Sequence, residues 1–106
     1  PLSDAREMTD WQSHDIYYQL GNIGSEIGRA MKWKDTNRSR AESAADRALE
    51  LLDWSLSDSK NKKYLKEIAR IREVFADSFF GDNQFAQDEQ TWNLYFLPYA
   101  LATNKK

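Results

Sequence analysis

The sequence predicts an all-α fold of one domain, an antiparallel four-helix bundle. Apolar residues recur at intervals of three and four along most of the chain, which is the period of an amphipathic helix. Turn-forming segments interrupt this pattern, and no stretch shows the strict alternation of a half-buried strand. A chain of 106 residues has the length of one domain. Four helices joined by short turns fit that length as a bundle.

The first half of the chain predicts a tail and two helices. Residues 1–10 show no clear period, and we expect a flexible N-terminal tail there. The first predicted helix covers residues 11–33, and its apolar face consists of Ile16, Leu20, Ile23, Ile27 and Ala30. The second covers residues 40–57 and has an alanine-rich face. Ser39 and Glu42 have the spacing of a capping box, which would start this second helix.

The second half predicts two further helices, at residues 60–80 and 87–103. Asp58 or Ser59 is expected to cap the first of them, and Gly81 to end it in the left-handed conformation. Pro98 removes one helical hydrogen bond from the last helix and is expected to kink or shorten it. Residues 104–106 are expected to form a C-terminal tail.

Three of the four glycines lie in "QLGNIGSEIGRA", as Gly21, Gly24 and Gly28. Their spacing matches neither the dinucleotide-binding loop nor the P-loop, and the apolar helical stripe continues through them. We interpret them as a notch for close helix packing, in preference to a helix break or a phosphate site. Three bodies are candidates to fill the notch: the alanine face of the second helix, an aromatic side chain of the last helix, or a second copy of the chain.

Charged rows on the predicted helices are interpreted as solvated faces. Asp46, Glu50 and Asp53 form an acidic row and are weak candidates for a metal site, and Lys62, Lys63, Lys66 and Arg70 form a basic row. The single histidine, His14, has no second histidine with which to build a zinc site. We therefore predict neither a metal nor a cofactor.

The end of the third predicted helix holds the densest cluster of polar residues. Its members are Arg72, Asp77, Asp82 and Asn83. An arginine beside an apolar stripe, with acids within two turns, indicates either a partly buried ion pair that fixes the turn or a polar pocket.

The four tryptophans indicate an interface. Trp11, Trp33, Trp54 and Trp92 do not all fit easily into one small core, and exposed aromatic side chains mark protein contacts. We therefore expect a homodimer or another protein as the partner. The net charge of −2 does not favour nucleic acid. The absence of cysteine and of an apolar run of about 18 residues predicts a cytoplasmic protein without a membrane partner.

Two family resemblances extend these observations. The stretches "IYYQLGNIGSEIGRA", "RALELLD" and "REVFADSFFGDN" resemble a small family of uncharacterised prokaryotic helical proteins, which implies a helical bundle and no known activity. Arg72 followed by Asp77 and Phe79 is similar to the arginine motif of HEPN (higher eukaryote and prokaryote nucleotide-binding) domains, with Asp77 in place of the usual histidine. That resemblance implies a dimeric helical RNase or a partner of a nucleotidyltransferase.

These observations predict a non-catalytic helical module for protein interaction, which we expect to be homodimeric. The alternative is a HEPN-like protein that handles nucleotides or RNA, with Arg72 holding phosphate and Asp77 orienting it or acting as a base.

Overall fold

The helices begin at short polar side chains. In the computed structural model, which describes residues 2–104, Asp15 accepts a hydrogen bond from the backbone N–H of Tyr18 (2.9 Å). In the same way, the Asn37 side chain accepts a hydrogen bond from the backbone N–H of Arg40 (3.2 Å). Asp or Asn at these positions satisfies an N–H group that the first helical turn leaves free. The elements that result are α1 (Leu2–Gln12), α2 (Ile16–Trp33), α3 (Arg38–Leu56), the 3-10 helix η1 (Ser59–Tyr64), α4 (Leu65–Phe80) and α5 (Glu89–Asn104).

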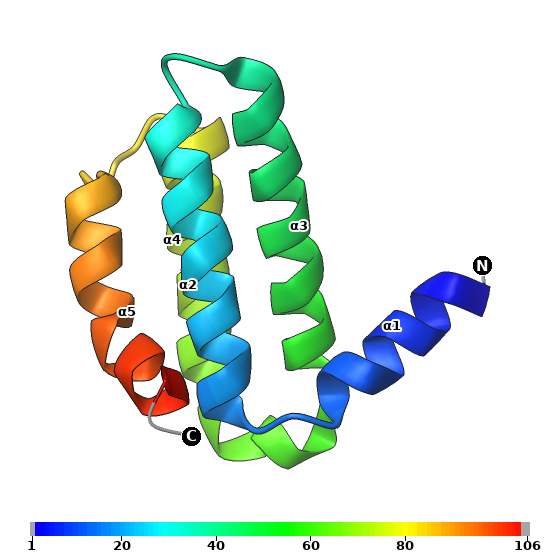
Figure 1. Cartoon of the computed structure of the whole chain (residues 1–106). Coiled ribbons are helices and arrows are strands. Elements are labelled where there is room, and N and C mark those ends of the chain that lie inside the picture. The colour runs from blue at the N-terminus through cyan, green and yellow to red at the C-terminus, as the bar shows by residue number, and fades with distance from the viewer. Residues whose placement is uncertain (1, 105–106) are drawn as a thin grey trace.

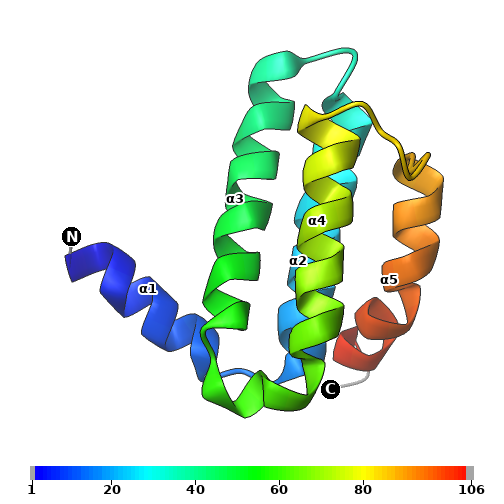
Figure 2. The ribbon, with the colours of Figure 1, turned by 180° about the vertical axis from the view of Figure 1, so that it is seen from behind.

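The four long helices run in alternating directions (Figure 1). Helix α2 packs along α3 and along α5, and α4 lies behind α2 (Figures 1 and 2). Helix α1 projects sideways from the end of the molecule where α3 ends and α4 begins. The all-α prediction is confirmed. The predicted four-helix bundle is not confirmed in that form, because the described residues contain five α-helices.

The first predicted helix is divided in two by the structure. Residues 1–10 were expected to be a tail, but Leu2–Gln12 form α1, and α2 begins only at Ile16. The break follows from Asp15, whose side chain caps α2 and competes with a continuous helix. Of the predicted C-terminal tail, residues 105 and 106 lie outside the described residues, and Asn104 ends α5.

Two predicted caps are wrong, and one is confirmed. Helix α3 starts at Arg38 and is capped by Asn37, not by Ser39. Gly81 has φ −103°, so α4 does not end in a left-handed glycine. Asp58, one of the two residues predicted to cap this segment, caps η1.

The core forms where the predicted apolar stripes meet. The predicted stripe of α2 is entirely buried, and so are the alanine face of α3 and the inner face of α4. Trp11 of α1 and both Trp92 and Phe96 of α5 complete this core. Small side chains on α3 allow the α2 and α3 backbones to lie close together, which larger residues would prevent.

The glycine notch on α2 holds an aromatic side chain of α5. A Cβ atom placed on Gly24 would lie 2.5 Å from Cγ and 2.6 Å from Cβ of Phe96, which is closer than real carbon atoms approach. Only glycine therefore allows α5 to lie where it does. A Cβ atom placed on Gly28 would instead meet the side-chain amide oxygen of Asn93 at 2.8 Å. That oxygen is the far end of a flexible side chain. Of the three candidate bodies, the aromatic side chain of the last helix is confirmed.

We expect Gly24→Ala to lower the free energy of unfolding by about 1–3 kcal/mol, the usual cost of overpacking. Gly28→Ala is the matched control, because Asn93 can turn away while alanine favours the helix by about 0.5–1 kcal/mol. Urea denaturation of both variants measures the difference. Equal destabilisation by the two substitutions would contradict this account of the notch.

Candidate functional site

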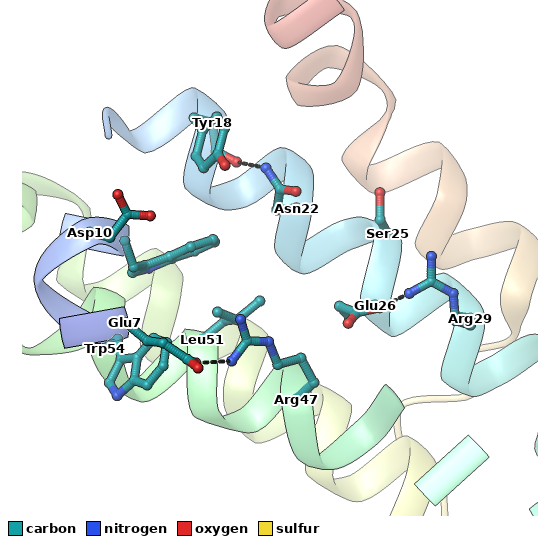
Figure 3. A pocket seen from close by; sticks show the side chains of 11 residues that line it. Glu7, Asp10, Tyr18, Asn22, Ser25, Glu26, Arg29, Arg47, Leu51 and Trp54 are labelled. Carbon is teal, nitrogen blue, oxygen red and sulfur yellow. Dashed lines mark hydrogen bonds and ion pairs between the residues drawn. The ribbon is translucent and has the colours of Figure 1, made fainter. Parts of the chain in front are cut away.

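A polar cleft of about 420 Å³ lies between α1, α2 and α3 (Figure 3). Helix α1 contributes Glu7 and Asp10, and α3 contributes Arg47 and Trp54. The wall from α2 is polar over two turns, and it consists of Asn22, Ser25, Glu26 and Arg29. Helix α1, which projects from the bundle (Figure 1), supplies one wall of this cleft.

Arg47 is the central cation of the cleft. Its guanidinium donates to Glu50 at 2.6 Å and to Glu7 at 3.4 Å, and it lies over the Trp54 ring, 5.3 Å from the centroid. Figure 3 shows Glu7 reaching from α1 across to Arg47. All of these groups are partly exposed, so each ion pair contributes little to stability.

The other charges of the cleft leave an excess of acid. Arg29 pairs with Glu26 of the same helix. Asp10 lines the cleft, and no described residue donates a hydrogen bond to its carboxylate. Three lining carboxylates therefore face two guanidinium groups that already have acidic partners. This balance favours polar or cationic groups over phosphate.

A buried polar network beneath the cleft fixes the position of α1. The Gln19 side chain, which is fully buried, donates to the backbone oxygens of Trp11 and His14 and to Asp58. Its own oxygen accepts from Asn61 Nδ2 at 2.7 Å. One glutamine thus joins α1, α2 and η1, and its buried polar atoms are satisfied as a folded protein requires.

Two further bonds attach α1 to the end of α3. The Trp11 indole N–H donates to the Ser55 hydroxyl (2.9 Å), and that hydroxyl donates to the Leu51 carbonyl (2.8 Å). The Gln12 side chain donates to the Trp54 carbonyl at 2.8 Å. Polar networks of this kind specify one arrangement of the elements they join.

Asp58 is the ionised member of this network. Burial alone would raise its pKa, but hydrogen bonds from Lys60 and Gln19, together with the charge of Lys60, outweigh burial and hold the pKa below its ordinary value. The folded state therefore favours the ionised carboxylate.

Sequence reasoning missed the cleft, although one signal was present. Asn22, Ser25, Glu26 and Arg29 have the spacing of one helix face, directly beside the apolar stripe. The residues that face them come from α1 and α3, and no short-range pattern predicts that these helices meet.

Arg72 and Asp77 do not form a common site. The Arg72 guanidinium donates to Asp53 of α3, from Nε to Oδ1, at 2.7 Å. The Asp77 carboxylate accepts instead from the backbone N–H of Phe85 at 3.2 Å, and its backbone oxygen accepts from Gly81 and Asn83. Arg72 therefore joins two helices, and Asp77 organises the loop that follows α4.

That loop has a defined conformation with local strain. The Asn83 side chain bonds both the N–H and the carbonyl of Gln87, at 2.9 and 3.0 Å. Asn83 and Ala86 have φ values of 53° and 52°, a conformation that costs an alanine about 1–2 kcal/mol. Asp82, the remaining residue of the predicted cluster, is exposed.

The acidic row of α3 is distributed over separate ion pairs. Glu50 pairs with Arg47 and Asp53 with Arg72, while Asp46 is exposed. Among the side chains of residues 5–102, no group of three or more acidic or histidine residues is arranged to hold a metal ion. The basic residues Lys62, Lys63, Lys66 and Arg70 are all exposed.

The tryptophans do not form the exposed surface that the sequence suggested. Trp11 and Trp92 are buried in the core. Trp33 and Trp54 are partly buried against it, and each has an arginine over its ring, Arg40 and Arg47 respectively. Each of these two rings has a cation–π contact and packs in part against the core.

The exposed apolar surface is instead on α5. Leu94, Leu97 and Leu101 are 61%, 48% and 51% exposed. Leu94 and Leu101 lie on the side opposite Trp92 and Phe96, which face the core, and Leu97 lies at the edge of that side, next to α2. We call these three leucines the outer face of α5.

No family model, curated protein or solved structure matches this chain. The two family resemblances of the sequence therefore stay predictions. None of the helices in the described part of the chain has both the length and the apolar character needed to cross a membrane.

We expect Asp58→Asn to lower the free energy of unfolding at neutral pH by about 1–3 kcal/mol, because charged hydrogen bonds at a buried site are lost. Since the folded state lowers the pKa of Asp58, its stabilisation is present above about pH 4 and is lost as the pH falls through the folded pKa. Wild type and variant should therefore converge in acid.

Urea denaturation between neutral pH and pH 3 measures this convergence. Asp82→Asn removes the same charge from an exposed position and serves as the control, with stability close to wild type at neutral pH. A difference between wild type and Asp58→Asn that stays constant down to about pH 3 would contradict the role of the ionised carboxylate.

Proposed function

We propose that this chain is a non-catalytic protein-interaction module whose partner is a second copy of itself, bound through the outer face of α5. The same proposal places the module in the cytoplasm and treats α2 to α5 as an antiparallel bundle to which α1 is attached. The observation that carries it is the leucine face of α5, which the core of a single copy leaves exposed.

Burial of this face is favourable because its leucines are half exposed or more. Each leucine that a partner covers contributes hydrophobic free energy in proportion to the apolar area removed from water. A surface helix normally carries charged residues on the side facing water. The leucines of α5 occupy that side instead, at the spacing with which two helices pack side by side.

A second copy fits this face because the face carries no charge. After Glu89, α5 has no charged residue through Asn104, so two copies can meet without like-charge repulsion. The outward faces of α3 and α4 differ, because they carry ion pairs such as Arg72 with Asp53 and Arg70 with Glu73. Covering those charges would cost desolvation energy.

The size of the face predicts a dissociable dimer. A helix of 16 residues is about 24 Å long, and one helix face supplies less than the roughly 800 Å² per partner of a standard interface. We therefore expect the monomer and the dimer to exchange with concentration.

The HEPN-like alternative has less support from the described residues. It requires Arg72 and Asp77 to face one opening, whereas Arg72 binds Asp53 and Asp77 binds the loop. Neither residue lines the polar cleft.

Sedimentation equilibrium over a wide range of concentrations tests the interaction module. We expect a reversible dimer for the wild type, and at least about tenfold weaker association for Leu94→Glu or Leu101→Glu, because each places a charge in the contact. Thermal stability should stay close to wild type in both variants, since the substituted side chains are exposed.

Phe80→Glu is the matched control. Phe80 and Leu101 are equally exposed, 51% each, but Phe80 belongs to α4 and not to the outer face of α5. We expect Phe80→Glu to dimerise like the wild type. A wild type that stays monomeric at every concentration, or a control that loses association as strongly as Leu101→Glu, would overturn the proposal.

A further inference from the structure

The polar cleft between α1, α2 and α3 has the size of a ligand site and fixed walls. Its volume of about 420 Å³ lies within the range of about 300–1,000 Å³ that is usual for small-molecule pockets. The wall from α1 is held in place by the buried hydrogen bonds of Gln19 and Trp11. A site whose walls are ordered before binding loses less conformational entropy when a ligand enters.

Asp10 supplies a carboxylate of the cleft that has no cation beside it among the described residues. Three carboxylates and two guanidinium groups line the cleft, and both guanidinium groups already have acidic partners. Asp10 and Arg29 lie at opposite ends of the cleft (Figure 3). The Asp10 side chain is exposed, and Ser13 bonds only the backbone oxygen of this residue. A solute in the cleft can therefore reach an uncompensated negative charge, which attracts a cation.

Aromatic rings beside Asp10 also suit a positively charged group. Trp11 of α1 and Tyr18 of α2 both line the cleft, and the centroids of their rings lie 5.9 Å apart. An ammonium group within about 6 Å of such a ring is attracted to its face. The cleft already contains one contact of this kind, between the Arg47 guanidinium and the Trp54 ring. A carboxylate next to aromatic rings holds an ammonium ion, whereas it repels an anion.

The wall from α2 favours a polar ligand. The Asn22 amide nitrogen donates to the Tyr18 carbonyl at 2.8 Å, which leaves the amide oxygen as an acceptor. The Ser25 hydroxyl donates to the Gly21 carbonyl at 3.3 Å and can still accept a hydrogen bond. Leu51 is the aliphatic residue of the lining. Polar groups placed in this way fix the orientation of a ligand, and hydroxyl groups are suitable partners for them.

We propose that the polar cleft binds a small primary amine that carries hydroxyl groups, as its ammonium ion. The ammonium group pairs with the Asp10 carboxylate beside the rings of Trp11 and Tyr18, and the hydroxyl groups bond Asn22 and Ser25. The cleft is formed by α1, α2 and α3, whereas the proposed dimer uses the leucines of α5. Binding in the cleft therefore goes beyond the proposed self-association and does not depend on it.

Glucamine, sorbitol and gluconate test the charge of the ligand at nearly constant size. They share one hydroxylated carbon chain and differ in one end group, which is an ammonium, a hydroxyl and a carboxylate group respectively. The probes are titrated into the ¹⁵N-labelled full chain, and the indole N–H signals of the four tryptophans are observed. We expect glucamine to shift the signals of Trp11 and Trp54 saturably and to leave that of Trp92, which does not line the cleft, unchanged. Glucamine should bind at least about tenfold more tightly than sorbitol or gluconate, as one charged hydrogen bond allows.

Substitutions of Asp10 test the ion pair. Asp10→Asn keeps the size of the side chain and removes its charge, so glucamine should then bind about as weakly as sorbitol. Thermal stability should stay close to wild type, because the substituted side chain is exposed. Asp10→Lys should reverse the preference in favour of gluconate. Asp46→Asn is the matched control, since Asp46 is also exposed but does not line the cleft, and it should keep the preference for glucamine.

Three results would contradict this assignment. They are signals of Trp11 and Trp54 that glucamine does not shift saturably, equal affinity for glucamine and sorbitol in the wild type, and a preference for glucamine that survives Asp10→Asn. Leu101→Glu, which should weaken the proposed dimer, should bind glucamine like the wild type. A failure of the cleft to bind is therefore distinguishable from a failure of dimerisation.

Discussion

The close approach of α5 to α2 at Gly24 determines much of this structure. Because Gly24 has no side chain, the Phe96 ring lies directly against the α2 backbone, and this contact lets α5 lie close to α2. In that position α5 directs Trp92 and Phe96 to the core and Leu94, Leu97 and Leu101 to solvent. The exposed leucine face of α5 therefore depends in part on this close approach.

The opposite side of the molecule depends on hydrogen bonds rather than on close packing. Gln19 and Asp58 connect α2 to the end of α1 and to η1, so that α1 projects at a fixed place and supplies one wall of the polar cleft. Buried polar groups are costly when one partner is lost, and the hydrogen bonds and the charge of Lys60 in this corner hold the pKa of Asp58 below its ordinary value. Apolar packing thus positions α5, and polar bonding positions α1.

Periodicity predicted the parts of this fold that local sequence controls. The buried stripe from Ile16 to Ala30 and the alanine face of α3 are confirmed, because each is a property of one helix. The break at Asp15 and the start of α3 at Asn37 were missed, because a cap competes with helix continuation through one side chain. The polar cleft combines residues of three helices, and only tertiary packing brings those together. Arg72 and Asp77 were candidates either for an ion pair or for a polar pocket, and they bond to different segments, since sequence proximity on a helix does not place two side chains on one face.

A double-mutant cycle between Gly24 and Phe96 tests the central claim most directly. Phe96→Ala removes Cγ and Cδ1, two of the three side-chain atoms nearest to a Cβ on Gly24. If the ring is what excludes a side chain at that position, Gly24→Ala costs less free energy of unfolding in the Phe96→Ala background than in the wild type, by at least about 0.5 kcal/mol, as expected for residues in contact. Because the Phe96 Cβ, which would lie 2.6 Å from the same position, stays in Phe96→Ala, an equal cost of Gly24→Ala in both backgrounds would show that the ring itself does not exclude a side chain there, and it would contradict the account.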